Sequence, residues 1–397
     1  MKLPSKSDIV KVLVVAVVTI SLSRMLVYVP LSVSFFASSG VADINQFDIY
    51  SDLQQAQGMM PYEDNIVMVT LPEGSTRYEL AEALLMLSEC NPAAVAVDVD
   101  LRGGKDPDID AMLIDAIKAC NNVVVPCKAD CLDDTTRFFA SARELGIRWG
   151  YTNLDTRGRD NAVIRSFTTF YVDTNTCDTI YSLPLQAVKL VAPERVRELV
   201  SHHTSREYIN FTIDFLTLSY EEIPDWAEEI NGAIVMLGVD TRRDVYRTSI
   251  DTHTLGLKIH AYTATTVLRS AYIRPLGNWV TQVFAFVVIA FFVALNIYFS
   301  RHFPRAGGFL VRTTNYILFF SLLISSFVLF SERAVYSDCG WFLMAIAFCP
   351  WATDIYTLLH IFVHKIAEWW RVLRVMMQRR RAANKKTETK NNFLEKE

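Results

Sequence analysis

The 397 residues combine 51% hydrophobic residues and a mean hydropathy of +0.20 with 21% charged residues. This blend is too apolar for an ordinary soluble enzyme and too charged for a pure membrane bundle. Residues 37–276 carry 21 Lys/Arg against 35 Asp/Glu, a net charge of −14, whereas residues 365–397 carry 10 against 4, a net charge of +6. The acidic middle argues against nucleic acid as a ligand, and the basic tail fits anionic membrane lipid.

Four apolar stretches predict transmembrane helices. The first, residues 9–36, exceeds the roughly 20 residues that a helix needs to cross a bilayer. A cleavable signal peptide is the alternative, because small residues follow at 37–39. Its apolar core would be about twice the usual length, so we expect an uncleaved anchor. The other three stretches are residues 279–300, 316–330 and 341–363.

The distribution of basic residues orients these spans. Arg301, Arg305 and Arg312 follow the second span, lysines precede the first, and the basic tail follows the fourth. By the positive-inside rule these segments face the cytoplasm, which places the middle of the chain in the periplasm, or outside the cell, of a bacterium with the helices in its inner membrane. The expected division is 1–36 for the N-terminus and first span, 37–276 for the outer domain, 277–363 for three further spans and 364–397 for a cytoplasmic tail.

Two ionisable residues fall inside the expected spans. Burying a charge in hydrocarbon is expensive, so such residues are functional candidates. We expect Arg24 to extend toward the outer interface and Asp354 to face another helix.

The outer domain alternates short apolar strands with amphipathic helices. Continuous apolar strands that alternate with helices indicate a parallel sheet covered on both faces. The predicted fold class is therefore α/β, with a largely parallel sheet covered by helices, attached to a four-helix transmembrane region of one N-terminal and three C-terminal spans. Strands are expected at 65–71, 93–101, 122–126 and 232–238, helices at 75–90, 108–119 and 257–270, and strands of less certain order at 162–172 and 209–220.

Several motifs together, in this order and spacing, resemble the second type of CHASE domain. They include FDIYSDL at 47–53, NIVMVTL at 65–71, AAVAVDVDL at 93–101, NAVIRSF at 161–167, and GAIVMLGVD with GLKIHAYTATTVLRS at 232–240 and 256–270. The resemblance covers about residues 43–276. It implies an extracytoplasmic sensor module of the kind attached to cyclases, histidine kinases and protein kinases, commonly with one span before it and three after it.

The resemblance also implies an output that this chain does not visibly carry. The related proteins often continue into a cytoplasmic kinase or cyclase domain, whereas only residues 364–397 follow the last expected span here. Such a tail is too short for a catalytic domain. We therefore expect a sensor that binds an unknown outer ligand or partner and signals to a separate effector protein at the membrane.

Polar residues at strand ends are candidate ligand-binding positions. Asp98 and Asp100 end one predicted strand and Asp106 follows, while Asp240 follows a later strand and His260 lies early in the next helix. Ligands of open α/β sheets bind outside the carboxyl ends of strands, so these side chains are candidates to line one pocket for a cation or basic ligand. The simpler interpretation is that the aspartates serve turns and helix caps and that His260 is a structural hydrogen-bonding group.

Other chemistry-bearing residues point to structure rather than catalysis. Arg165 is the best candidate for an internal ion pair with an acidic residue. No Gly-rich phosphate loop, GxSxG elbow or HExxH motif occurs, so we expect neither an enzyme nor a cofactor or metal site.

Five cysteines fall in the outer domain, at positions 90, 120, 127, 131 and 177, and an oxidising periplasm permits two disulfides among them. Cys90 and Cys120 each end a helix just before a strand, which makes them the first expected pair. Cys127 and Cys131 are each alternative partners of Cys177, and zinc binding is less favoured for want of a suitable His/Cys set.

Two functions from different classes fit these features. One is a sensor or signal-relay protein, and the other is a structural or assembly subunit that recruits partners to a membrane complex without sensing. A transporter is less favoured because the spans lack visible inverted repeats.

Overall fold

The computed structural model divides the chain into two compact units, each described separately. The helical unit comprises Met1–Pro30, Gly277–Ser325 and Cys339–Glu397, and the sheet unit comprises Leu31–Leu276 and Ser326–Asp338. The structure describes residues 6–28, 46–56, 61–101, 106–120, 122–127, 146–156, 163–172, 179–202, 206–303, 305–337 and 340–394.

Six strands form the central sheet of the sheet unit, in the order β10-β1-β11-β2-β3-β4. Every neighbouring pair is parallel. The largely parallel α/β sheet predicted from the apolar strands is thus confirmed, and four of its strands lie where the sequence places them. The strand bounds are β1 Tyr62–Leu71, β2 Ala94–Asp98, β3 Val123–Cys127, β4 Arg148–Tyr151, β10 Asp214–Ser219 and β11 Ile234–Val239.

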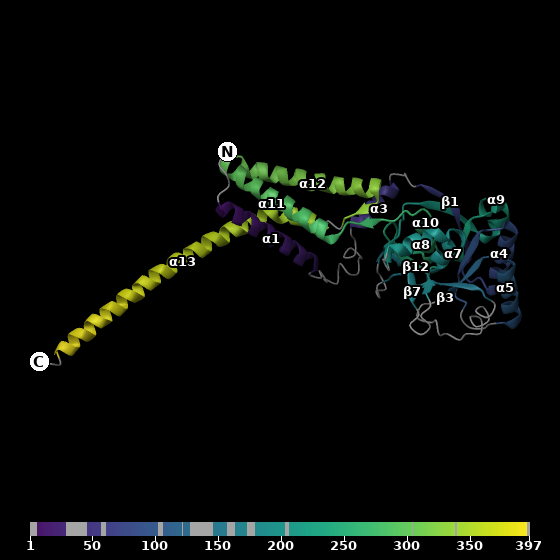
Figure 1. Cartoon of the computed structure of the whole chain (residues 1–397), viewed down its shortest axis with the longest axis horizontal. Helices are drawn as coiled ribbons and strands as arrows, with labels where there is room; N and C mark the ends of the chain where they lie inside the picture. Colours follow the sequence, from purple (N-terminus) through teal and green to yellow (C-terminus); the bar gives the residue numbers. More distant parts are fainter. Residues whose placement is uncertain are drawn as a thin grey trace. The chain divides into compact units, whose positions relative to one another are not determined.

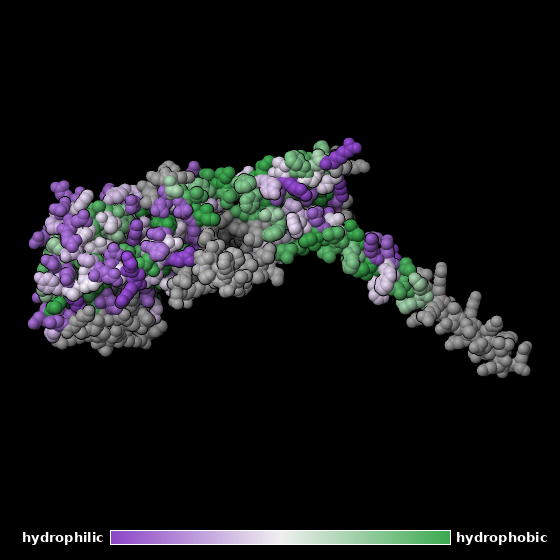
Figure 2. Space-filling view, turned by 180° about the vertical axis from the view of Figure 1, so that it is seen from behind, coloured by the Kyte–Doolittle hydropathy of each residue, from purple (hydrophilic) through white to green (hydrophobic). Residues whose placement is uncertain are grey.

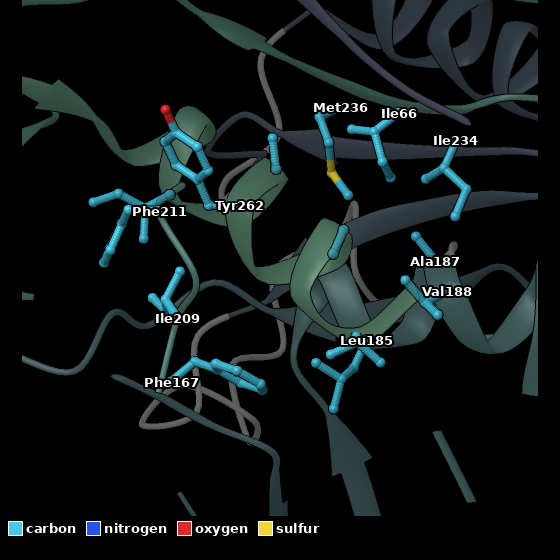
Figure 3. Close-up of a cluster of buried hydrophobic side chains, with 14 of the residues drawn as sticks. Ile66, Phe167, Leu185, Ala187, Val188, Ile209, Phe211, Ile234, Met236 and Tyr262 are labelled. Atoms are coloured by element: carbon cyan, nitrogen blue, oxygen red, sulfur yellow. The ribbon is translucent and has the colours of Figure 1, made fainter. Parts of the chain in front are cut away.

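Helices cover both faces of this sheet. On one face Val67, Val95 and Val235 share a buried core with α4 (Arg77–Cys90) and α5 (Pro107–Ala119). On the other face Ile66 and Met236 share a core with α7 (Leu183–Val191) and α10 (Gly256–Leu268), part of which Figure 3 shows. Successive side chains of a strand point to opposite faces, so a strand buried on both faces must be apolar at consecutive positions.

Shorter elements complete the sheet unit. In the described part of the chain four small groups of strands lie outside the central sheet, in the orders β13-β12-β5, β6-β9, β7-β8 and β14-β15. The remaining elements are α3 Gln46–Ala56, β5 Val163–Ile164, β6 Ser166–Thr168, β7 Phe170–Val172, β8 Thr179–Tyr181, α8 Pro193–Ser201, β9 Arg206–Tyr208, η3 Tyr220–Trp226, α9 Ala227–Ile230, β12 Val245–Thr248, β13 Thr254–Leu255, β14 Arg274–Pro275 and β15 Val335–Tyr336.

Aromatic rings gather where α3 meets the last turns of α12 (Gly307–Arg333) and β15. The ring centroid of Phe47 lies 5.7 Å from that of Phe330 and 5.5 Å from that of Tyr336. Pro275 of β14 pairs with Tyr336 of β15, so the chain just before α11 (Asn278–His302) joins the same place. We call these rings the junction cluster, which consists of Phe47, Tyr50, Tyr208, Phe327, Phe330 and Tyr336.

Long apolar helices make up the helical unit: α1 (Lys6–Tyr28), α11, the first part of α12, and α13 (Gly340–Leu394). Within the described residues, three helical stretches are long and apolar enough to cross a membrane, and Figure 2 shows hydrophobic residues along the surface of these helices. These stretches are Trp279–His302, Gly307–Arg333 and Ala345–Arg374. The 23-residue helix α1 covers most of the first expected span, whose membrane crossing stays a prediction.

Side-chain contacts fix α1 against α11 and α13. Val15 and Ala16 of α1 are buried in one core with residues of both helices. Arg301 Nη1 donates to Asp8 Oδ2 at 2.8 Å, and Lys11 Nζ donates to Thr357 Oγ1 at 3.2 Å. Because Asp8 begins α1 and Arg301 ends α11, the two helices are antiparallel.

Three expectations about the membrane helices need correction or fall outside the described residues. Asp354 does not face another helix: it is exposed on α13, because the neighbouring Ala352 and Thr353 occupy the buried face. Arg312 lies inside α12 rather than in the loop before it. The side chain of Arg24 lies outside the described residues.

The last helix also departs from the expected division at residue 363. It is a single helix of 55 residues, drawn in yellow in Figure 1, and it continues through the basic segment to Leu394. Pro350 lies inside it and has no N–H to donate to the carbonyl of Ile346.

A buried carboxylate joins β1 to the end of α10. Arg269 Nε donates to Glu63, and the backbone and side-chain nitrogens of Asn65 donate to Glu63 Oε1 at 2.9 and 2.8 Å. Burial by itself raises the pKa of Glu63, but the hydrogen bonds from Arg269 and Asn65 outweigh it and hold the pKa below its ordinary value.

The pair predicts acid sensitivity of the fold. A carboxyl group with a lowered folded-state pKa stabilises the fold above its unfolded-state pKa, and this contribution is lost as the pH falls through the folded-state value. Below pH 4.5, the ordinary value, the wild-type chain should therefore lose stability more steeply than Glu63→Gln. Thermal unfolding of the full chain in detergent from pH 7 downward measures both slopes. The exposed Glu228→Gln should behave as wild type, and equal slopes for Glu63→Gln and wild type would contradict the assignment.

Candidate functional site

The carboxyl ends of β2 and β11 lie side by side at one edge of the sheet. Asp98, the last residue of β2, is in register with Gly238 of β11. A Cβ atom at Gly238 would lie 3.1 Å from the carbonyl oxygen of Asp98 and 3.1 Å from the side chain of Leu257. The absence of a side chain therefore lets the first turn of α10 approach this edge closely.

His260, in the second turn of α10, lies beside Asp98. The distance from His260 Nε2 to Asp98 Oδ2 is 3.7 Å, and the two side chains are only 4% and 15% exposed. The two side chains lie next to each other, although 3.7 Å is longer than a hydrogen bond. The structure thus brings together Asp98, which the sequence places at a strand end, and His260, which it places early in a later helix.

Tyr246 and Asp244 complete this polar cluster. The hydroxyl of Tyr246 donates to the carboxylate of Asp244. Burial, followed by the negative charge of Asp244, the hydrogen bond to it and the charge of Asp98, raises the pKa of Tyr246 well above its usual value. The carboxylate of Asp244 also lies against Gly256, the first residue of α10, where the helix dipole favours negative charge and a Cβ atom would collide with it.

We call Asp98, Asp244, Tyr246 and His260 the strand-end cluster. It offers two carboxylates, an imidazole and a phenol at the edge of a parallel sheet, where ligands of such sheets bind. This set suits a cationic ligand or one rich in hydrogen-bond donors. Among the described residues no group of three or more His, Cys, Asp or Glu side chains is arranged to hold a metal ion.

The other strand-end aspartates have different positions. Asp100 is exposed beyond β2. Asp106 caps α5, because its Oδ1 accepts a hydrogen bond from the backbone N–H of Asp108 at 2.9 Å. Asp240 is exposed, and the cleft that it is expected to share with His260 stays a prediction. Asp106 therefore has the capping role that was its simpler interpretation.

Arg165 forms the internal ion pair that the sequence predicts, but with a residue near the start of the domain. Its Nε donates to Asp48 Oδ1 at 2.7 Å and its Nη2 to Asp48 Oδ2 at 2.5 Å, and the side chains are 4% and 11% exposed. This bidentate pair holds α3 against the segment between β5 and β6. Arg165 is thus an anchoring residue of α3 and not a member of the strand-end cluster.

Arg77 is a buried arginine that the sequence pattern does not reveal. It forms an ion pair with Asp110 of α5, and its Nη2 donates to the carbonyl of Leu101 at 2.8 Å. It therefore fixes the chain just after β2 to α4 and α5. The only signal for it is an arginine in the first turn of a helix whose neighbours are apolar.

The expected disulfide between Cys90 and Cys120 is not present, and both are buried free thiols. Cys90 Sγ donates to the carbonyl of Met86 at 3.4 Å. Burial raises the pKa of Cys90 and raises that of Cys120 to about 12, so both groups are protonated and poorly reactive. Cys131 and Cys177 lie outside the described residues.

A double-mutant cycle tests the Tyr246–Asp244 contact. We expect Tyr246→Phe and Asp244→Asn to be non-additive in the free energy of unfolding, with a coupling of about 0.5–3 kcal/mol, because the two groups share a hydrogen bond. Denaturation of the full chain in detergent measures all four proteins. Combining Asp244→Asn with Tyr78→Phe, an exposed tyrosine on α4, should give additive changes. Additivity in both cycles would remove Tyr246 from the cluster.

A parallel α/β domain in one chain with helices that are long and apolar enough to cross a membrane is typical of a membrane protein with one large folded domain. The family model described as CHASE2 domain matches residues 25–298, and the chain belongs to this family. Its members are extracellular sensory domains, as the sequence resemblance implies. Comparison with curated proteins and comparison with solved structures each found no match.

Proposed function

We propose that this protein is a membrane-bound sensor or signal-relay protein of a bacterial inner membrane. Its CHASE2 domain binds a ligand or partner on the outer side, and the change passes through the membrane helices to a separate effector protein. The sensory role rests on membership of the family. The observation that carries the relay is the junction cluster, which connects the folded domain directly to residues of α12 and β15.

The junction cluster supports a relay because its members continue into the membrane helices. Phe330 belongs to the last turn of α12, and Tyr336 of β15 precedes α13 by a few residues. The paired strand β14 directly precedes α11. A shift of α3 or of β14 in the domain would therefore act on the ends of three long helices at once.

The strand-end cluster is the ligand site that we propose. Its two carboxylates favour a small cationic ligand, such as an amine, over an anion. Ligand contact with Asp98 and His260 would act on β2 and α10, and α10 ends at Leu268, a few residues before β14. The site and the junction are thus connected through one helix and a short segment.

Ligand-dependent stabilisation of the full chain tests this site. In nanodiscs, a panel of polyamines, quaternary amines and amino-acid esters should contain a compound that raises the unfolding temperature, since a ligand at about 100 times its Kd stabilises by about 2.7 kcal/mol. Asp98→Asn and His260→Gln should each abolish that shift.

The matched control is Asp225→Asn, which removes an exposed carboxylate from η3 and should leave the shift intact. A panel without any stabilising compound would count against small-molecule sensing. A constitutive stoichiometric protein in purified material, together with such a negative panel, would favour the structural or assembly role instead.

Four spans with the N-terminus inside are the topology that we propose. The Asp8–Arg301 ion pair supports placing the start of α1 and the end of α11 on the same side. Arg301 and Arg305 favour the cytoplasm for that side. The domain between these helices would then lie in the periplasm.

Accessibility labelling tests the topology. A membrane-impermeant maleimide should label Glu228→Cys in cells whose outer membrane has been permeabilised, and Arg305→Cys only after the inner membrane is opened, because both positions are exposed but belong to opposite sides. The unsubstituted chain gives the baseline from its native cysteines. Early labelling of Arg305→Cys would overturn the proposed orientation.

A further inference from the structure

Asp354 is an exposed acid inside a stretch that is apolar enough to cross a membrane. It lies on α13 within Ala345–Arg374, and around it Trp351, Ile355 and Leu358 are 71%, 46% and 66% exposed. Apolar side chains are stable in contact with lipid tails, whereas burying an unpaired carboxylate among lipid tails costs free energy. Asp is also too short to reach the headgroups as lysine and arginine do. We therefore expect a basic side chain to pair with Asp354 on this face of α13.

Another helix carries an exposed basic residue that also lies inside a candidate membrane span. Arg312 of α12 lies within the candidate span Gly307–Arg333, next to Phe309 and Tyr316, which are 72% and 63% exposed. In the described part of the chain, neither Asp354 nor Arg312 forms an ion pair. Lys11, at a neighbouring level, already donates to Thr357 and lies over the ring of Tyr356.

Contacts between the helices place Asp354 and Arg312 at a similar depth. Arg301 of α11 is level with Asp8 of α1, and Lys11 is level with Thr357 of α13. Lys11 lies three residues from Asp8 along α1, and Asp354 lies three residues beyond Thr357 in the same direction along the bundle. At 1.5 Å per residue the two steps together place Asp354 about 9 Å farther along the bundle than Arg301.

Arg312 lies at nearly the same depth as Asp354, as the contact between α11 and α12 indicates. Gly307 begins α12 against Phe299 of α11, since a Cβ atom there would lie 2.9 Å from the carbonyl oxygen of Phe299. Phe299 is two residues from Arg301, and Arg312 is five residues past Gly307, so Arg312 lies about 10 Å from the level of Arg301. The two depths thus agree within one helical turn.

We propose that a second copy of this chain docks on the lipid-facing side of α12 and α13, with Asp354 of one copy paired to Arg312 of the other. Two copies in one membrane share the same orientation, so residues of equal depth meet across the interface. A two-fold axis along the membrane normal makes the pair reciprocal and neutralises both charges in each copy. Trp351 and Leu358 on one side and Phe309 and Tyr316 on the other supply apolar area around the ion pair.

Charge exchange in the full chain tests this interface. Labelled protein in vesicles of phosphatidylethanolamine and phosphatidylglycerol should show energy transfer between copies that rises with the protein-to-lipid ratio. Asp354→Arg alone and Arg312→Asp alone should each weaken self-association by about tenfold or more. The doubly exchanged chain should recover the wild-type value, because the opposite charges are restored with their positions swapped.

The control Arg305→Asp makes the same charge change in the turn before α12 and should leave self-association unchanged. Thermal unfolding and the labelling of Glu228→Cys show that each variant is folded and correctly inserted. A monomeric wild-type chain, single exchanges without effect, or a double exchange without recovery would each overturn the proposal. Capture of a different membrane protein that depends on Asp354, with a monomeric wild-type chain, would assign the surface to that protein instead.

Discussion

Burial of the α12–α13 connection inside the sheet unit is the constraint on which the rest of the molecule depends. Phe330 and Tyr336 are each 4% exposed. They share one hydrophobic core with Phe47 and with two residues of the central sheet, Ile66 and Ile234. A connection between two membrane helices is ordinarily a surface turn. Here its side chains cannot leave the core without losing a large aromatic packing area, so the last turns of α12 and strand β15 are held within the sheet unit.

The strand-end cluster depends on backbone geometry as much as on polar side chains. Gly238 lets α10 approach the carboxyl end of β2, and Gly256 leaves room for the carboxylate of Asp244. His260 reaches Asp98 because α10 begins so close to the sheet edge. The cluster thus holds two carboxylates near a buried imidazole and a partly buried phenol.

The sequence predicts what local pattern controls and fails where distant segments meet. Consecutive apolar residues reveal the buried strands, and the rule for strand ends brings Asp98 and His260 to one edge. No local signal places β11 between β1 and β2, since strand order depends on contacts between remote segments. For the same reason Asp48, 117 residues from Arg165, could not be named as its partner. Tyr246 was missed because its position depends on where β12 packs.

The unbroken helix α13 has a mechanical consequence. Its 55 residues from Gly340 to Leu394 form a rod of about 80 Å. Helices bend most readily at proline, and Pro350 lies near the end of the rod that follows β15. Measured from that pivot, Leu394 is about ten times as far away as Asp354, at 1.5 Å per residue. A tilt too small to disturb the contacts around the pivot would therefore be amplified, as by a long lever arm, into a wide sweep of the far tip.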